Sequence, residues 1–222
     1  MFSRIPPVTK ALLLVNIAMF LLQQVFEEPM LAWLGLWPIV PGEGLLSGAS
    51  LFMPWQLLTY AFLHGDSMHL LFNMLALVMF GAQLEHLWGS RRYLVYFGVC
   101  VLGAGLCQLA LTSASVSQGG PMYPTLGASG GVFGLLLGYG MLFPNQRVML
   151  LFPPIPMKAR TLVIVYGVVE LLLGFTGLQP GVAHFAHLGG MLFGGLLLLY
   201  WRRRPKPPSS SGRGSSHLRV VK

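Results

Sequence analysis

The fold is decided around Thr125-Leu126-Gly127-Ala128-Ser129-Gly130-Gly131-Val132-Phe133-Gly134, where a serine stands among glycines at the start of an apolar run. No charged residue occurs between Arg92 and Arg147, so this serine is predicted to lie at membrane depth, at the beginning of a helix. The first turn of a helix offers unpaired backbone N–H groups and a positive dipole end, and both suit an oxyanion. The alternative interpretation is a glycine-rich packing face, in which the serine only hydrogen-bonds a neighbouring helix.

The composition is that of a membrane protein. The chain has 222 residues, of which 55% are hydrophobic and only 9% are charged, whereas soluble domains carry about 25% charged residues. A membrane crossing needs about 20 apolar residues. We therefore expect one all-α polytopic membrane domain over residues 1–204, a bundle of six transmembrane helices at about 10–26, 67–87, 92–111, 129–143, 160–177 and 184–201.

The charges are distributed asymmetrically between these predicted spans. All 14 lysines and arginines stand before the first span, between the second and third, between the fourth and fifth, or after the sixth. The other side has only acidic residues, and the positive-inside rule therefore places both termini in the cytoplasm. The net charge of +8 is then a signal of topology, and we expect no nucleic-acid partner. Residues 205–222, rich in Pro, Ser, Gly and basic residues, are predicted to be a disordered basic cytoplasmic tail.

Two segments depart from simple membrane crossings. Residues 27–66 are rich in aromatic residues, so this long connection is predicted to lie in the membrane interface. The fourth span ends at Pro144 after about 14 residues, or about 21 Å, against a hydrocarbon core of about 30 Å. Its outer end therefore lies below the membrane surface, and residues 112–128 must dip inward to reach it. These lengths predict a water-filled pit with Ser129 on its floor.

Polar side chains gather near the outer ends of two other spans. They are His64, His69, Asn73, His184 and His187. His69 and Asn73 are four residues apart and share one helix face, as do the two later histidines at a spacing of three. Because ionisable and polar groups inside a membrane are costly, they are candidates for function. Their common depth with Ser129 predicts a single site.

Chemistry suggests a role for each group in such a site. A serine hydroxyl is a weak nucleophile that needs an adjacent base, and histidine has a suitable pKa. We expect Ser129 to be the nucleophile and His187 the general base. His69, Asn73 and the Ser129 N–H can donate to a developing oxyanion. The role of Glu170 stays open: no acidic residue is obvious as a third member, so the prediction is a Ser–His dyad.

A zinc site built from the histidines is the rival interpretation. The sequence contains no HExxH motif, and Asp66 is the only carboxylate that we expect within reach of the histidines. We therefore predict no metal and no cofactor.

Small residues recur at helical spacing in the fourth and sixth spans. Gly130, Gly134 and Gly138 form one face, and Gly190 and Gly194 form another. Such faces let helix backbones approach closely. The expected contact would bring His187 to Ser129.

Taken together, three motifs resemble the rhomboid family of intramembrane serine proteases. They are Gly127-Ala128-Ser129-Gly130, Ala186-His187-Leu188-Gly189-Gly190 and His64-(x4)-His69-(x3)-Asn73, within residues 10–201. The resemblance implies Ser129 as nucleophile, His187 as base, and His69, Asn73 and the Ser129 N–H as oxyanion hole, supported by Gly127, Gly130, His64 and His184. It also implies that Phe133 stacks beneath the base and that Glu85 is a structural cap. The Trp-Arg pair that many members carry in the first loop is absent.

The resemblance implies an intramembrane serine endopeptidase that cleaves transmembrane segments of other membrane proteins, in the minimal six-span form of a bacterial inner membrane. Its partners would be transmembrane-helix substrates and the lipid bilayer; the oligomeric state and the natural substrate stay open. One alternative is a catalytically inactive rhomboid-like binder of transmembrane helices, which would lack the dyad that this chain keeps. A transporter would show two repeated halves, and none is found.

Overall fold

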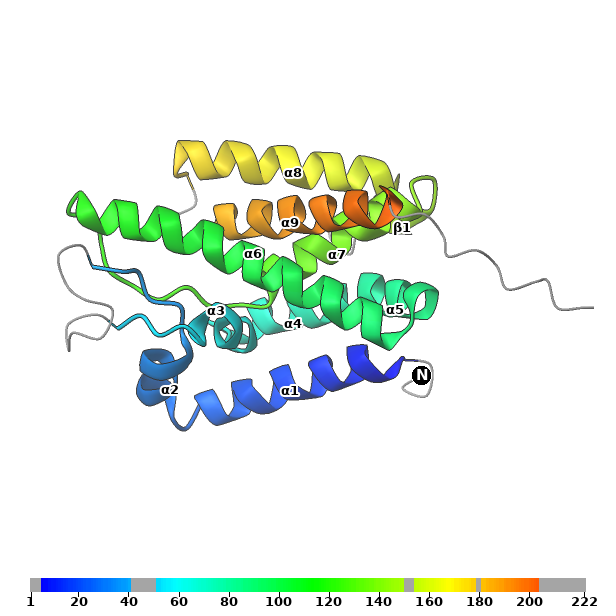
Figure 1. Cartoon of the computed structure of the whole chain (residues 1–222). Coiled ribbons are helices and arrows are strands. Elements are labelled where there is room, and N and C mark those ends of the chain that lie inside the picture. Colours follow the sequence, from blue (N-terminus) through cyan, green and yellow to red (C-terminus); the bar gives the residue numbers. More distant parts are fainter. Residues whose placement is uncertain (1–4, 41–50, 150–153, 179–180, 204–222) are drawn as a thin grey trace, which may run out of the picture.

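The computed structural model describes residues 5–40, 51–149, 154–178 and 181–203, and its long helices run roughly alongside one another (Figure 1). The helices, in chain order, are α1 (Pro7–Gln23), α2 (Glu27–Leu34), α3 (Gln56–Thr59), the 3-10 helix η2 (Tyr60–Phe62), α4 (Ser67–Ala76), the π-helical turn η3 (Leu77–Gly81), α5 (Ala82–Trp88), α6 (Ser90–Ser117), α7 (Ser129–Leu142), α8 (Ala159–Thr176) and α9 (His184–Arg203). Two short strands, β1 (Arg147–Met149) and β2 (Pro156–Lys158), pair antiparallel between α7 and α8.

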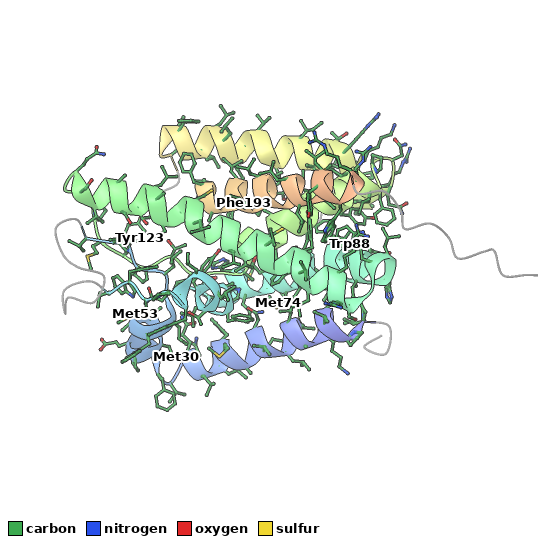
Figure 2. All side chains as sticks on the ribbon, viewed as in Figure 1. Met30, Met53, Met74, Trp88, Tyr123 and Phe193 are labelled. Carbon is green, nitrogen blue, oxygen red and sulfur yellow. The ribbon has the colours of Figure 1, made fainter. Side chains whose placement is uncertain are left out.

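Long apolar helices identify the chain as an integral membrane protein. Four of the described helices are long and apolar enough to cross a membrane: the continuous helix Ser67–Trp88, α6, α8 and α9. The shorter apolar helices α1 and α7 have 17 and 14 residues. The outer side of the bundle is covered with apolar side chains, which project outward from α1 and α8 in Figure 2; Ile164 and Phe175 of α8 are examples of exposed ones. The all-α polytopic fold predicted from composition is confirmed.

Helix α7 is the centre of the bundle, because glycines let its neighbours approach its backbone. A Cβ atom on Gly190 of α9 would overlap the carbonyl oxygen of Gly130, and one on Gly134 would overlap the Cys100 side chain of α6. The Tyr96 hydroxyl donates to the Gly134 carbonyl at 2.8 Å. The close packing predicted for the fourth and sixth spans is therefore present, and it rests on the absence of side chains.

Glu85 ties three helices together at the other end of the bundle. Its carboxylate accepts hydrogen bonds from the Val8 N–H at 3.0 Å, the Thr9 N–H at 2.7 Å and the Thr9 hydroxyl at 2.8 Å. It also accepts from the Ser90 hydroxyl at 2.6 Å. Since Pro6 at the N-cap of α1 makes no side-chain capping bond, a carboxylate from α5 satisfies the first donors of α1 instead. This is the capping role expected for Glu85.

The connection between α1 and α4 folds into short helices and supports the approach to Ser129. The Trp33 and Trp55 rings stack at 6.4 Å, which orders this first loop without a Trp-Arg pair. Leu36 and Thr125 exchange backbone hydrogen bonds of 3.1 and 2.9 Å. The Gly127 N–H donates to the Tyr60 carbonyl at 2.9 Å. The first loop thus holds the segment that leads into α7.

One connection differs from expectation. Residues 112–117 do not dip inward, because α6 continues as a helix to Ser117; only residues 118–128 form the approach to α7. After α7 the strands β1 and β2 pair antiparallel, with Val148 opposite Met157. The predicted tail 205–222 lies outside the described residues.

Candidate active site

The site is built on the first turn of α7. Ser129 is the first residue of this helix, and Ala128 at the N-cap makes no side-chain capping bond to the N–H groups of the first turn. Gly127 has φ +125°, a backbone conformation that favours glycine. A Cβ atom there would lie 2.8 Å from Cε1 of the His69 ring. Glycine at this position therefore both shapes the turn and admits His69 beside Ser129.

His187 reaches Ser129 from the first turn of α9. Its Nε2 lies 2.7 Å from the Ser129 Oγ, and the ring is buried, with 8% of the residue exposed. The Phe133 ring, one turn after Ser129 on α7, stacks on the imidazole with a centroid distance of 4.2 Å and an interplanar angle of 4°. The ring is thus held flat on one side, with one nitrogen pointing at the serine hydroxyl.

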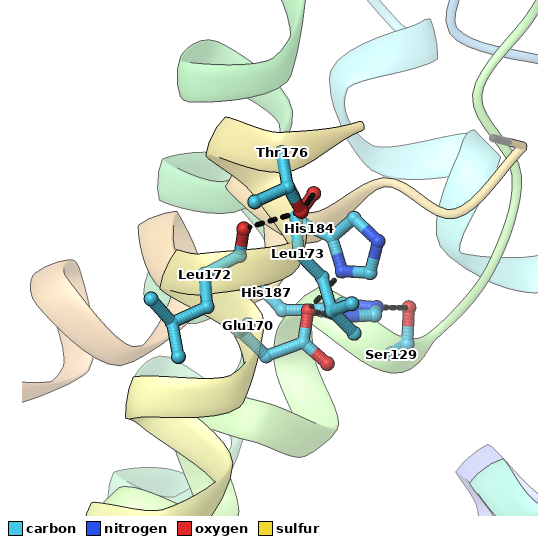
Figure 3. A network of polar contacts seen from close by, with 7 residues as sticks. All are labelled: Ser129, Glu170, Leu172, Leu173, Thr176, His184 and His187. Carbon is cyan, nitrogen blue, oxygen red and sulfur yellow. Dashed lines mark hydrogen bonds and ion pairs between the residues drawn. The ribbon is translucent and has the colours of Figure 1, made fainter. Parts of the chain in front are cut away.

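The carboxylate of Glu170 contacts the other ring nitrogen of His187. The expectation that Asp66 is the only carboxylate near the histidines is therefore wrong. Oε2 of Glu170 lies 2.8 Å from the His187 Nδ1 and 2.7 Å from the His184 Nδ1 (Figure 3). Glu170 is itself 7% exposed. The spacings in the chain are 14 and 17 residues, and Glu170 comes from α8, so neither helical spacing nor a motif could reveal this contact.

In the described part of the chain, these three residues also form a group that could hold a metal ion. One possible ligand atom from each of Glu170, His184 and His187 lies within 4.8 Å of the others. Ligands of a tetrahedral zinc ion at about 2.0–2.1 Å are themselves about 3.3 Å apart. The oxygen–nitrogen distances of 2.7 and 2.8 Å are shorter and correspond to charge-assisted hydrogen bonds. In this structure the cluster is therefore held together by hydrogen bonds.

A cavity of about 910 Å³ opens beside Ser129. The predicted oxyanion donors His69 and Asn73 line it together with Ser129 and His187. Asp66 caps α4, the helix that carries both donors, because its side chain accepts the His69 N–H at 2.8 Å. This hydrogen bond lowers the pKa of the Asp66 carboxyl, so the cap is ionised at neutral pH.

The structure separates the two supporting histidines from this cavity. His64 is fully buried, packs edge-on against His69 at 5.0 Å, and is not among the residues that line the cavity. Burial lowers the pKa of His64 to about 4, which keeps the ring neutral. His184 faces Glu170 instead of Ser129. The single site predicted from common depth is thus divided. Four of its residues line the cavity, namely His69, Asn73, Ser129 and His187, whereas His64 and His184 are buried outside it.

At the start of the short helix α7, a serine hydroxyl beside a cavity is thus hydrogen-bonded to a stacked imidazole. A sequence model of the Rhomboid domain matches residues 52–204. The chain belongs to the rhomboid family.

Several known proteins are similar in sequence to this chain. RHOMBOID-like protein 4 of Arabidopsis thaliana is 34% identical over 144 residues, which are 64% of this chain and 33% of that protein. Rhomboid protease GlpG of Klebsiella pneumoniae is 28% identical over 190 residues, or 85% and 60% of the two chains. Rhomboid protease AarA of Providencia stuartii is 25% identical over 212 residues, or 89% and 73%. The match thus spans one third of the first relative and three fifths of the second.

Proposed function

We propose that the protein is an intramembrane serine endopeptidase, with Ser129 as nucleophile and His187 as general base. The observation that carries the proposal is the 2.7 Å contact between the Ser129 Oγ and the His187 Nε2 at the edge of a cavity in a membrane protein. Relatives named rhomboid protease support the same activity.

The reaction follows from this contact. The Ser129 oxygen attacks a substrate carbonyl while His187 Nε2 takes the hydroxyl proton, and a tetrahedral intermediate forms. His187 then returns the proton to the leaving amine, which departs and leaves an acyl-enzyme. Water, deprotonated by the same nitrogen, attacks the ester and releases the second product with Ser129 restored. Phe133 holds the imidazole in place through both halves.

The negative oxygen of the intermediate would be stabilised by donors around the cavity. One N–H of the Asn73 amide donates to the His69 carbonyl at 3.0 Å. This bond fixes the side chain, and the amide has a second N–H that can donate to substrate. His69 stands against Gly127, and the Ser129 N–H begins α7. Donors fixed before the reaction need no reorganisation as charge develops.

The cavity wall fits an apolar substrate. The side of the cavity formed by α4 and η3 is lined by the side chains of Met68, Phe72 and Met79, all of them exposed. A polypeptide that leaves the bilayer beside α4 would keep its apolar side chains covered while one carbonyl reached Ser129. We therefore infer that the substrates are membrane-spanning segments of other proteins. We also infer that both termini lie in the cytoplasm, since the lysines and arginines stand in the two terminal segments and in the connections on the same side of the membrane.

The test uses purified protein in detergent with a generic single-span membrane protein as substrate, and Ser129→Ala as the matched variant. We expect wild type to release two fragments and the variant to release none, with both proteins unfolding at similar temperatures, because one hydroxyl beside an open cavity adds little stability. Cleavage by Ser129→Ala above about one per cent of wild type would exclude Ser129 as nucleophile. Binding of the substrate without cleavage by wild type would instead support an inactive binder.

A further inference from the structure

Behind the serine and histidine lies a second buried layer with an unusual hydrogen-bond pattern. A single carboxylate oxygen, Oε2 of Glu170, contacts the Nδ1 atoms of both His184 and His187, at 2.7 and 2.8 Å (Figure 3). All three residues are less than one tenth exposed. An ionised carboxylate only accepts hydrogen bonds, so each Nδ1 must carry the hydrogen.

This pattern places a hydrogen on the Nδ1 of both rings. With that hydrogen on Nδ1, the His187 ring can present a lone pair at Nε2 to the Ser129 hydroxyl, which is the form a general base needs. The His184 Nε2 is buried and has no hydrogen-bond partner among the described residues. In the described chain the His184 ring is therefore hydrogen-bonded to Glu170 alone.

We propose that Glu170 is a positioning residue that acts through His187, and that His184 holds its carboxylate in place; the inference rests on the proposed function. When the Ser129 proton moves to the His187 Nε2, the imidazole becomes a cation with the Glu170 carboxylate already at its other nitrogen. The positive charge is paired as it forms, by a carboxylate that is itself buried. The Ser129 oxygen gains the bond to the substrate carbon, and the proton stays on His187 until the amine leaves.

The other polar and titratable groups around His187 are weaker partners. His69 and Asp66 face the cavity from the α4 side, and Tyr166 of α8 packs against Phe133. Among the groups of the described chain that contact the His187 ring, only Glu170 carries a negative charge. Removing that charge should therefore leave the imidazolium that forms during the reaction without an ionic partner among these groups.

The experiment measures how fast a fluorophosphonate probe labels the protein in detergent micelles at neutral pH. Ser129 attacks the phosphorus, fluoride leaves, and His187 takes the proton, so the rate reports this pair without a known substrate. We expect Glu170→Gln to label at least about tenfold more slowly than wild type. Glu170→Asp keeps the charge and should restore part of the rate, which a merely structural role of Glu170 does not predict.

Control variants separate positioning from folding. Val169→Ala changes an exposed neighbour on α8 and should leave the labelling rate unchanged. If Glu170→Gln does not fold, the labelling rates of His184→Ala and His184→Asn test the positioning role of Glu170 instead. The alanine variant loses one donor to Glu170 and should label about three- to tenfold more slowly, whereas asparagine places an amide N–H at the Nδ1 position and should restore the rate.

The two proposals fail in different ways. If the probe does not label wild type, or labels Ser129→Ala equally well, the proposed function fails. If Ser129 is labelled but Glu170→Gln keeps the wild-type rate within about threefold, Glu170 has no positioning role. Equal rates for wild type and His184→Ala, where Glu170→Gln cannot be measured, overturn the inference as well.

Discussion

The contact between α7 and α9 leads to a prediction that links packing to catalysis. Gly190 stands three residues after His187 on α9, and a Cβ atom added there would overlap the backbone carbonyl of Gly130. Gly130 in turn follows Ser129 directly in α7. Because the obstacle is backbone, no side-chain rotation can relieve it, and Gly190→Ala must push the two helices apart beside the reacting atoms.

The size of the effect follows from these contacts. To reach an ordinary van der Waals distance of 3.4–4 Å, the helices must separate by about 1 Å or more. The Ser129–His187 distance of 2.7 Å would then exceed the hydrogen-bond range. A misplacement of about 1 Å can reduce a catalysed rate by about 10²-fold. The overlap should cost about 1–3 kcal/mol of stability, partly offset by the better helix propensity of alanine.

The assay compares the cleavage rate and the unfolding temperature of the same detergent preparation. Two glycine variants serve as controls: a Cβ on Gly195 of the same helix would meet only the end of the flexible Leu137 side chain, at 3.2 Å, and one on Gly98 of α6 would meet nothing within 4 Å. Both should retain activity, while Gly190→Ala should lose about 99% of it. A Gly190→Ala protein that cleaves within threefold of wild type would refute the argument that this contact sets the position of His187.

Three further outcomes are expected. Asn73→Ala should lower kcat by about 10- to 100-fold with KM little changed, because a donor to the oxyanion acts mainly in the transition state; unchanged kinetics at intact stability would exclude it. Glu85→Gln should leave the catalytic site intact but destabilise the protein by about 2–4 kcal/mol, seen as a lower Tm, since four hydrogen bonds converge on the carboxylate. Activity should survive strong chelators; loss that zinc restores would favour a metal at Glu170, His184 and His187.

Much of this architecture could be predicted because the bilayer imposes simple rules on sequence. Spans were located by apolar length, and the continuous helix Ser67–Trp88, α6, α8 and α9 begin and end within a few residues of the expected positions, except for the C-terminal end of α6. The short fourth span, bounded by Gly130 and Pro144, predicted a helix that starts at depth, and α7 has 14 residues. The polar residues within spans stood out because such groups are rare there.

Connections were harder to predict than spans. The turn before α7 depends on hydrogen bonds between Leu36 and Thr125, which are far apart in sequence, so local composition carries no sign of it. The residues after Leu111 are polar enough to suggest a loop, yet Thr112 donates back to the Gln108 carbonyl at 2.9 Å and the helix continues. A tertiary contact determines the first of these connections and a local side-chain hydrogen bond the second, and the hydropathy pattern shows neither.

Glu170 marks the limit of sequence reasoning in the site itself. A carboxylate within a span was recognised as costly, but its partner could not be found, since the two histidines that share its oxygen lie on another helix. The relation appears only when α8 and α9 are packed side by side. The same packing explains why the charge is tolerated: two N–H groups replace the water that Glu170 loses on burial. A buried carboxylate that needs both histidines to be stable will also constrain both, so the bonds that stabilise Glu170 are the ones that orient the base toward Ser129.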